Sequence, residues 1–144
     1  MIKQGAEPVF IAGNQTGILF LHGFTASPHE LRSFAELIHQ KKGFTVSVPL
    51  IAGHGESNEI LNNTRFNAFQ NSADTGYQNL KKICNKIFLV GMSMGGSLCL
   101  DLASKYQVDG IILMGTPLFL PLKTAFLPIV LPVKKYLKKH DGPD

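Results

Sequence analysis

The sequence predicts an α/β fold in which a parallel β-sheet carries helices on both faces. Between residues 16 and 117, apolar segments of strand length alternate with segments of helical periodicity in the order β-α-β-α-β-α-β. Residues 87–90 are apolar at every position, as in a strand that helices cover on both sides. Connections between parallel strands require such crossover helices, so we expect a sheet sandwiched between helical layers.

The part of the chain before residue 82 supplies the first strands and two helices. Ser27, Pro28 and Glu30 are the expected N-cap, first-turn proline and capping-box glutamate of a helix that carries Leu31, Phe34, Ala35 and Ile38 on one face. We expect Gly43 to end it. A second amphipathic helix has apolar residues three or four positions apart, at Phe66, Phe69, Ala73, Tyr77 and Leu80. Strands are expected at residues 8–11, 17–21 and 44–48, and a long loop is expected from Pro49 to about Asn63.

The segment 86–105 is the centre of the predicted fold. Its apolar strand stops at Gly91, Ser93 follows in a short turn, and helical spacing then begins. The helix has one polar stripe, formed by Ser97, Asp101, Ser104 and Lys105. Its other positions, Leu98, Leu100, Leu102, Ala103 and Tyr106, predict a mostly buried helix packed on the sheet. The last expected strand is 109–114.

The turn itself, Gly91-Met92-Ser93-Met94-Gly95, fits the pattern Gly-x-Ser-x-Gly of a nucleophile elbow. A serine in so tight a strand-to-helix turn has a strained backbone, and the residues two before and two after it must lack a Cβ atom. The hydroxyl of Ser93 would stand clear of the sheet, with the amide of Met94 directed at the oxygen that becomes negative in acyl transfer. The alternative is a glycine-rich turn in which Ser93 caps a helix.

Composition bounds the classes of function. The chain has 144 residues, 44% of them hydrophobic and 17% charged, which suits one domain with a core. Its net charge is +4, but residues 1–122 carry nine basic and eight acidic side chains, so +3 of that charge comes from the tail after Pro121. Residues 1–122 are thus nearly neutral and lack the excess of basic residues that is typical of nucleic-acid-binding proteins.

The remaining compositional signals are negative. Cys84 and Cys99 lack metal-ligand spacing and are expected to be buried free thiols, and we expect neither a metal nor an organic cofactor. The first residues do not resemble a signal peptide, so a cytoplasmic location is expected. The apolar stretch 118–133 is interrupted by Lys123 and by prolines and is too short for a bilayer span.

Three motifs in order, Leu21-His22-Gly23-Phe24, Gly53-His54-Gly55 and Gly91-Met92-Ser93-Met94-Gly95-Gly96, resemble the α/β-hydrolase superfamily. The resemblance is closest to bacterial carboxylesterases and monoacylglycerol lipases, and it covers residues 8–117, about three quarters of the chain. It implies a serine hydrolase of short-to-medium acyl esters, with a mobile lid over an apolar pocket and a small acyl ester as its binding partner.

The same resemblance implies roles for particular residues. Ser93 would be the nucleophile, and the backbone amides of Phe24 and Met94 would form the oxyanion hole, with the elbow glycines Gly91 and Gly95 permitting the turn. The side chain of Phe24 would line the acyl pocket. Many relatives carry tryptophan in the helix after the Gly-His-Gly loop, where this chain has Phe69.

The triad of this superfamily runs serine, then Asp or Glu, then histidine along the chain. After Ser93 the only histidine is His140, in a charged tail that we do not expect to supply the base. Asp101 is on the polar stripe of its helix, and Asp109 begins a strand at the end opposite the turn. The triad acid and histidine are therefore expected to be missing.

Histidines upstream of the turn do not replace the missing base in this interpretation. His22 and His54 are in turn motifs, where they are expected to hold loop backbone, although His54 could come near the pocket. His29 and His39 belong to the first helix.

The sequence thus predicts a hydrolase fold truncated after the strand that follows the elbow. Residues 1–117 are expected to form the N-terminal half of the core, and 118–144 the start of a lid-like segment and a basic tail. Three possibilities stay open: a serine esterase acting through a Ser93 acyl-enzyme, an inactive fragment kept as a binding module, and one half of a split enzyme. The uncovered sheet edge predicts self-association or a complementing chain.

Overall fold

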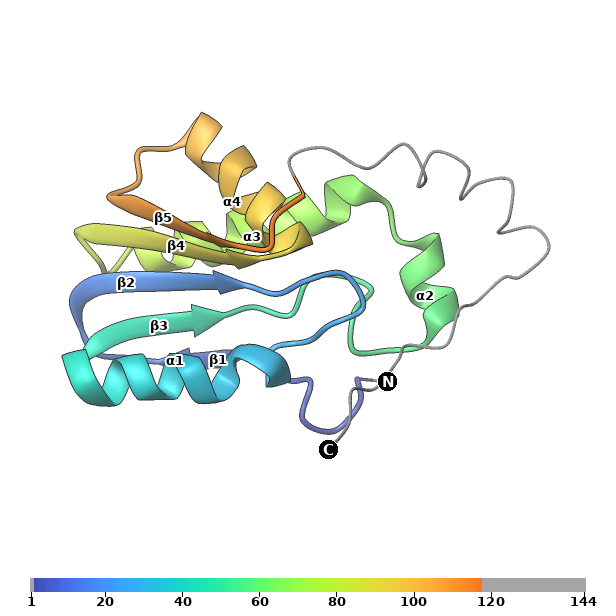
Figure 1. The fold of residues 1–144 in the computed structure, drawn as a ribbon, viewed down its shortest axis with the longest axis horizontal. Helices are drawn as coiled ribbons and strands as arrows, with labels where there is room; N and C mark the ends of the chain where they lie inside the picture. The colour runs from blue at the N-terminus through green and yellow to red at the C-terminus, as the bar shows by residue number, and fades with distance from the viewer. Residues whose placement is uncertain (1, 118–144) are drawn as a thin grey trace.

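The computed structural model describes residues 2–117, which form a five-stranded sheet with helices on both faces (Figure 1). The hydrogen-bonded strand order is β1-β3-β2-β4-β5. The strands are β1 (Val9–Ile11), β2 (Asn14–Leu21), β3 (Phe44–Val48), β4 (Lys86–Met92) and β5 (Gly110–Met114). The helices are α1 (His29–Lys42), α2 (Asn58–Asn63), α3 (Phe66–Lys81) and α4 (Met94–Lys105). The expected lid-like segment, basic tail and His140 lie outside the described residues.

The four strands between residues 16 and 117 are parallel, as predicted, and β1 makes the sheet mixed. β3, β2, β4 and β5 run parallel, but β1 pairs antiparallel with β3, with Val9 opposite Val48. Only Ala12 and Gly13 connect β1 to β2. Because two residues cannot carry the chain back to the starting end of the sheet, β2 must run opposite to β1.

Two apolar clusters confirm that helices cover both faces. On one face, Leu31 and Ala35 of α1 pack with Phe20 of β2 and with Val46 and Val48 of β3. On the other face, α3 and α4 contribute to a larger cluster with β2 and β4, whose members include Leu19, Leu21, Phe69, Tyr77, Leu80, Leu89, Leu98 and Leu102. The alternation of successive residues between the two clusters follows from the period of two in a strand.

The start of α1 differs from the sequence prediction. Its N-cap is Pro28, in a right-handed helical conformation, and no side chain caps the helix. Backbone bonds from the Glu30 amide to the Ser27 carbonyl (3.2 Å) and from the Leu31 amide to the Pro28 carbonyl (3.1 Å) open it instead. The expected capping box was therefore wrong. The expected end was right, because Gly43 (φ 66°) donates its amide hydrogen to the His39 carbonyl.

The loop after β3 contains a helix that the periodicity did not indicate. α2 has six residues, and the hydroxyl of Ser57 caps it by accepting a hydrogen bond from the Ile60 amide (3.3 Å). So short a helix has less than two turns, so it leaves almost no apolar repeat to recognise.

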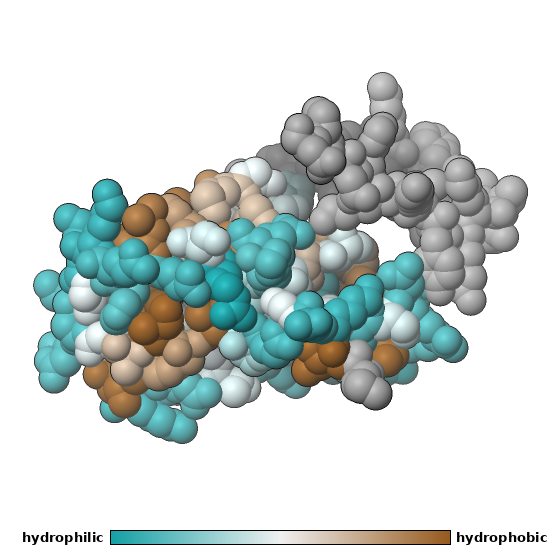
Figure 2. Space-filling view, turned by 90° about the horizontal axis from the view of Figure 1, so that it is seen from below, coloured by the Kyte–Doolittle hydropathy of each residue, from teal (hydrophilic) through white to brown (hydrophobic). Residues whose placement is uncertain are grey.

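Three apolar residues predicted on buried helix faces are largely exposed. The exposed fractions are 44% for Phe34, 52% for Phe66 and 38% for Leu100. Phe34 still contacts Phe20 edge to face, with ring centroids 5.7 Å apart. The surface seen from below in Figure 2 accordingly mixes hydrophobic with hydrophilic residues. Each helix is amphipathic, but its apolar stripe is wider than the strip of sheet that it covers.

The two cysteines are free and buried, as predicted. Burial raises the pKa of the Cys99 thiol to about 12 and also raises that of Cys84. Because the thiolate is the reactive form, both side chains are inert apolar groups of the core. None of the described helices combines the length and apolarity that a membrane crossing would require.

β5 is the last strand of the sheet among the described residues, and its side chains are exposed on both faces. Ile112 is 59% exposed and Leu113, which points to the opposite face, is 39% exposed. The strand contains no charged residue and no proline to protect its edge. The uncovered edge that the sequence predicted is therefore present in the described part of the chain.

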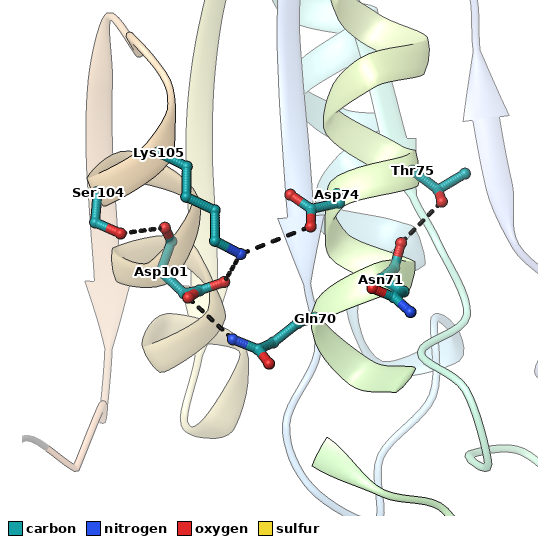
Figure 3. A network of polar contacts seen from close by, with 7 residues as sticks. All are labelled: Gln70, Asn71, Asp74, Thr75, Asp101, Ser104 and Lys105. Atoms are coloured by element: carbon teal, nitrogen blue, oxygen red, sulfur yellow. Dashed lines mark hydrogen bonds and ion pairs between the residues drawn. The ribbon is translucent and has the colours of Figure 1, made fainter. Parts of the chain in front are cut away.

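The polar stripe of α4 faces α3 through a small ionic network (Figure 3). Lys105 Nζ is 2.7 Å from Asp101 Oδ2 and 3.7 Å from Asp74 Oδ2. Gln70 of α3 donates a hydrogen bond to Asp101 Oδ1 (3.0 Å). Asp101 thus joins the two helices that cover one face of the sheet.

Replacing Asp101 should therefore weaken the packing of α3 on α4. We expect Asp101→Ala to lower the free energy of unfolding by about 1 kcal/mol at low salt, and by less in 1 M NaCl, because salt screens partly exposed ion pairs. Urea unfolding followed by circular dichroism measures both values. Glu36→Ala removes a carboxylate of α1 and is the control. Equal losses in the two variants would contradict the role given to the network.

Candidate active site

Ser93 is in the turn between β4 and α4, at the carboxyl end of the parallel strands (Figure 1). Its backbone has φ 52° and ψ −120°, outside the regions that a residue with a side chain favours. The residue is exposed. Ser93 is therefore an exposed residue on strained backbone.

The turn depends on two close approaches of main chain. A Cβ atom added to Gly91 would come within 2.5 Å of the Gly95 carbonyl oxygen and of the Gly96 amide nitrogen. One added to Gly95 would collide with the carbonyl oxygen of Leu21, at the end of β2. Glycine is thus required at both positions, as the sequence predicted, because backbone cannot move aside as a flexible side chain can.

The loop after β2 lies beside Ser93. A Cβ atom on Gly23 would be 3.4 Å from the Ser93 Cβ and 4.0 Å from its hydroxyl oxygen. Phe24 follows directly in the same loop. The structure therefore brings together the first and third motifs of the sequence, which are about 70 residues apart in the chain.

The amides of Phe24 and Met94 have no acceptor among residues 2–117. Met94 is the first residue of α4, where the amides of a helix have no partner within the helix. The adjoining amide of Ser93 is used, because it donates to the Met114 carbonyl of β5 (2.8 Å). Two donors without an acceptor in this part of the chain thus border the serine, and such donors can stabilise a negatively charged oxygen.

Thr25 has φ 63°, which is rare for a β-branched residue. It is in a turn closed by a hydrogen bond from the Ala26 amide to the Gly23 carbonyl (3.2 Å). Sequence analysis missed this strain because a threonine gives no signal for left-handed backbone. Such a conformation persists only where surrounding contacts hold it, and it is typical of functional loops.

His22 ties the loop after β2 to the loop after β3. Its Nε2 accepts a hydrogen bond from the Ile51 amide (3.1 Å), so the neutral ring carries its proton on Nδ1, which donates to the Gly23 carbonyl (3.0 Å). The ring is fully buried, and this burial lowers the pKa of His22 to about 4. The prediction that this histidine holds loop backbone is confirmed.

His54 is at the centre of a cluster of rings. Its ring centroid is 5.0 Å from that of His22, 5.7 Å from that of Phe24 and 5.2 Å from that of Phe69, in edge-to-face geometry each time. Nδ1 donates to the Ala52 carbonyl (3.1 Å), and Nε2 is buried with no hydrogen-bond partner among the described residues. Burial lowers its pKa as well. His54 therefore holds backbone, as predicted, and also contacts Phe24.

The other polar candidates are engaged elsewhere. Asp109 Oδ2 accepts a hydrogen bond from the Ile87 amide (2.7 Å), at the end of β4 opposite Ser93. His39 donates to the Phe44 carbonyl (2.8 Å), and Asp101 belongs to the network of Figure 3. Within residues 2–117, no histidine is hydrogen-bonded to Ser93, and no group of three metal-ligating side chains occurs.

A cavity of about 260 Å³ lies beside the loop that contains Thr25. Residues 3–6, 25–27 and 53–57 line it, together with His29 and Leu61, and Ser93 does not. The N-terminal residues are held there by a hydrogen bond from the Lys3 amide to the Gly55 carbonyl (2.7 Å). This hollow is therefore separate from the space above Ser93.

Comparison with known proteins assigns the family. The model of the alpha/beta hydrolase fold family matches residues 17–137, which is most of the chain. The chain belongs to this family. The match includes both loops that meet at Ser93.

Individual relatives of this hydrolase-fold chain act on esters, as their names state. It is 38% identical over 121 residues to a thermostable monoacylglycerol lipase of Bacillus sp. (strain H-257), covering 83% of this chain and 48% of the relative. It is 28% identical over 137 residues to a carboxylesterase of Bacillus subtilis (strain 168), covering 94% and 55%. The chain spans about half the length of these curated relatives.

A solved structure agrees with these relatives. A structure reported for the metagenome-derived lipolytic enzymes LipS and LipT superposes with a TM-score of 0.83 at 29% identity. The match covers 88% of this chain and 53% of that one. The predicted fold and the predicted resemblance are therefore both confirmed.

The close approach at Gly95 gives a test of the turn. We expect Gly95→Ala to lower the free energy of unfolding by about 3 kcal/mol or more, because the new methyl group must displace the end of β2. Urea unfolding measures the difference. Gly23→Ala is the matched control, since its Cβ would find ordinary contacts of 3.4 Å. A Gly95→Ala protein as stable as the control would show that the turn can relax.

The buried His22 predicts loss of stability in weak acid. Its pKa is about 4 in the folded chain and about 6.5 when unfolded, so the unfolded state binds the proton first. The stabilisation is complete above pH 6.5 and falls by about 3 kcal/mol as the pH decreases to 4. Urea unfolding across this range measures it. His22→Gln should flatten the profile, whereas an unchanged slope would contradict this assignment.

Proposed function

We propose that this chain is a serine hydrolase of carboxylic esters, in which Ser93 is the nucleophile of a nucleophile elbow. The observation that carries the proposal is an exposed serine on strained backbone, beside two amides that have no acceptor among residues 2–117. A serine that only capped α4 would accept a hydrogen bond through its hydroxyl oxygen from the first turn of the helix, and the Ser93 side chain makes no such cap hydrogen bond. This geometry favours the nucleophile over the structural alternative.

In the proposed reaction, the Ser93 oxygen bonds to the ester carbonyl carbon, and the carbonyl oxygen becomes negatively charged. The amides of Phe24 and Met94 donate to that oxygen, and each can lower the barrier by about 3 kcal/mol. The bond to the alkoxy group then breaks, and the proton from Ser93 leaves with the alcohol. Water attacks the resulting acyl-enzyme and releases the acid.

The proton must be carried by a general base, and no histidine within residues 2–117 is bonded to Ser93. A second candidate function follows from this and from the open edge of β5. In this alternative the chain is one half of a split hydrolase, or an inactive fragment that binds other chains. The exposed Ile112 and Leu113 favour an association at that edge.

Hydrolysis of p-nitrophenyl butyrate by the purified chain tests the first proposal. We expect Ser93→Ala to lower kcat/KM at least about a hundredfold, because it removes the nucleophile. Ser97→Ala, which removes a hydroxyl one turn further along α4, should keep the wild-type rate. Equal rates for wild type and Ser93→Ala would overturn the proposal for the isolated chain. A second polypeptide that co-purifies with the chain and restores turnover would support the split hydrolase.

A further inference from the structure

Three features of the molecule have no role in the proposed reaction: the cavity beside residues 3–6, the open edge of β5, and His54. Nothing in the cavity points to a particular ligand, because its one buried unpartnered atom, His54 Nε2, has no accessible surface. The edge of β5 offers no sign of what would cover it. His54 is different, because the structure shows which residues its ring contacts, and one of them is Phe24.

The loop that borders Ser93 is strained and needs support. Thr25 is held at φ 63°, and strain of this kind persists only where neighbouring contacts over-determine it. A hydrogen bond from the Ala26 amide to the Gly23 carbonyl (3.2 Å) closes the turn. Contacts made by the side chains of the turn can add to this backbone support.

Phe24 provides one such contact, because its ring meets the edge of His54. The side chain of Phe24 is 54% exposed, so the core holds only part of it. His54 itself is 2% exposed, and it is held by contacts with His22 and Phe69 and by the hydrogen bond from its Nδ1 to the Ala52 carbonyl. The contact thus joins a half-exposed side chain to a buried one with several other contacts.

We propose that His54 is a positioning residue that holds the turn Gly23–Ala26 in its strained shape and so directs the Phe24 amide toward the space above Ser93. His54 touches no reacting atom. It acts on Phe24 through the ring contact, since its Nδ1 is bonded to the Ala52 carbonyl and its Nε2 has no hydrogen-bond partner among the described residues. The link from this role to catalysis rests on the proposed function, whereas the link to the conformation of the turn does not.

Backbone relaxation of the 15N-labelled chain tests the conformational role without any need for activity. We expect His54→Ala to lower the order parameters of the Phe24 and Thr25 amides from about 0.85 toward 0.6, and His54→Phe to restore them. His39→Ala is the control, because it removes a histidine that also donates to a carbonyl but lies at the far end of α1. Unchanged order parameters in His54→Ala would overturn the proposal.

The reciprocal variant keeps the proposal testable if His54→Ala fails to fold. Phe24→Ala removes a largely exposed side chain, and it should loosen Thr25 to the same extent as the loss of the imidazole. A rigid Thr25 amide in Phe24→Ala would contradict the role of the ring contact.

The rate at which a fluorophosphonate labels Ser93 tests the consequence for the site. We expect His54→Ala to slow labelling on the order of tenfold, because a misdirected Phe24 amide loses only part of the effect of one oxyanion-hole donor. His54→Phe should restore the labelling rate. Wild-type chain that is never labelled would contradict the proposed function alone, and the relaxation data would still decide the role of His54. Equal labelling rates for wild type and His54→Ala would show that the turn does not aim the amide.

Discussion

The whole site depends on how closely α4 approaches the end of β2. Because Gly95 has no side chain, its Cα can lie against the Leu21 carbonyl, and the first turn of α4 then sits directly beside the loop that begins at His22. That single approach determines where Ser93 stands, which amides border it and how far Gly23 lies from its hydroxyl. A larger residue at position 95 would push the turn at Ser93 away from the loop after β2. The Ser93 hydroxyl and the Phe24 amide would then no longer lie close together.

Buried imidazoles provide the second layer of support. His22 joins the loops after β2 and β3, because its Nε2 accepts a hydrogen bond from the Ile51 amide while its Nδ1 donates to the Gly23 carbonyl. His54 adds edge-to-face contacts between the same two loops and α3. A neutral imidazole suits this task, because it is a flat ring with one donor and one acceptor at opposite ends. The two histidines thereby hold together the loops after β2 and β3, where no strand pairing does so.

Much of this arrangement was readable from the sequence, for identifiable physical reasons. The glycines around Ser93 and the apolar strand before it act locally, so their pattern predicts the strained turn. The orientation of β1 was missed, although the two-residue link before β2 contains that information. The strain at Thr25 was missed because a threonine carries no sequence signal for left-handed backbone. The exposure of Phe66 depends on how wide a strip of sheet α3 covers, which no periodicity encodes.

The N-terminal turn has a practical consequence for work with this protein. Lys3 is bonded to Gly55, and Ala6 is packed so closely against Gly55 that a Cβ atom there would be 2.9 Å from the Ala6 methyl group. The first residues thus brace the Gly-His-Gly loop from outside. An affinity tag fused directly before them would press on the loop that supports the serine, so a tag is better attached through a long flexible linker.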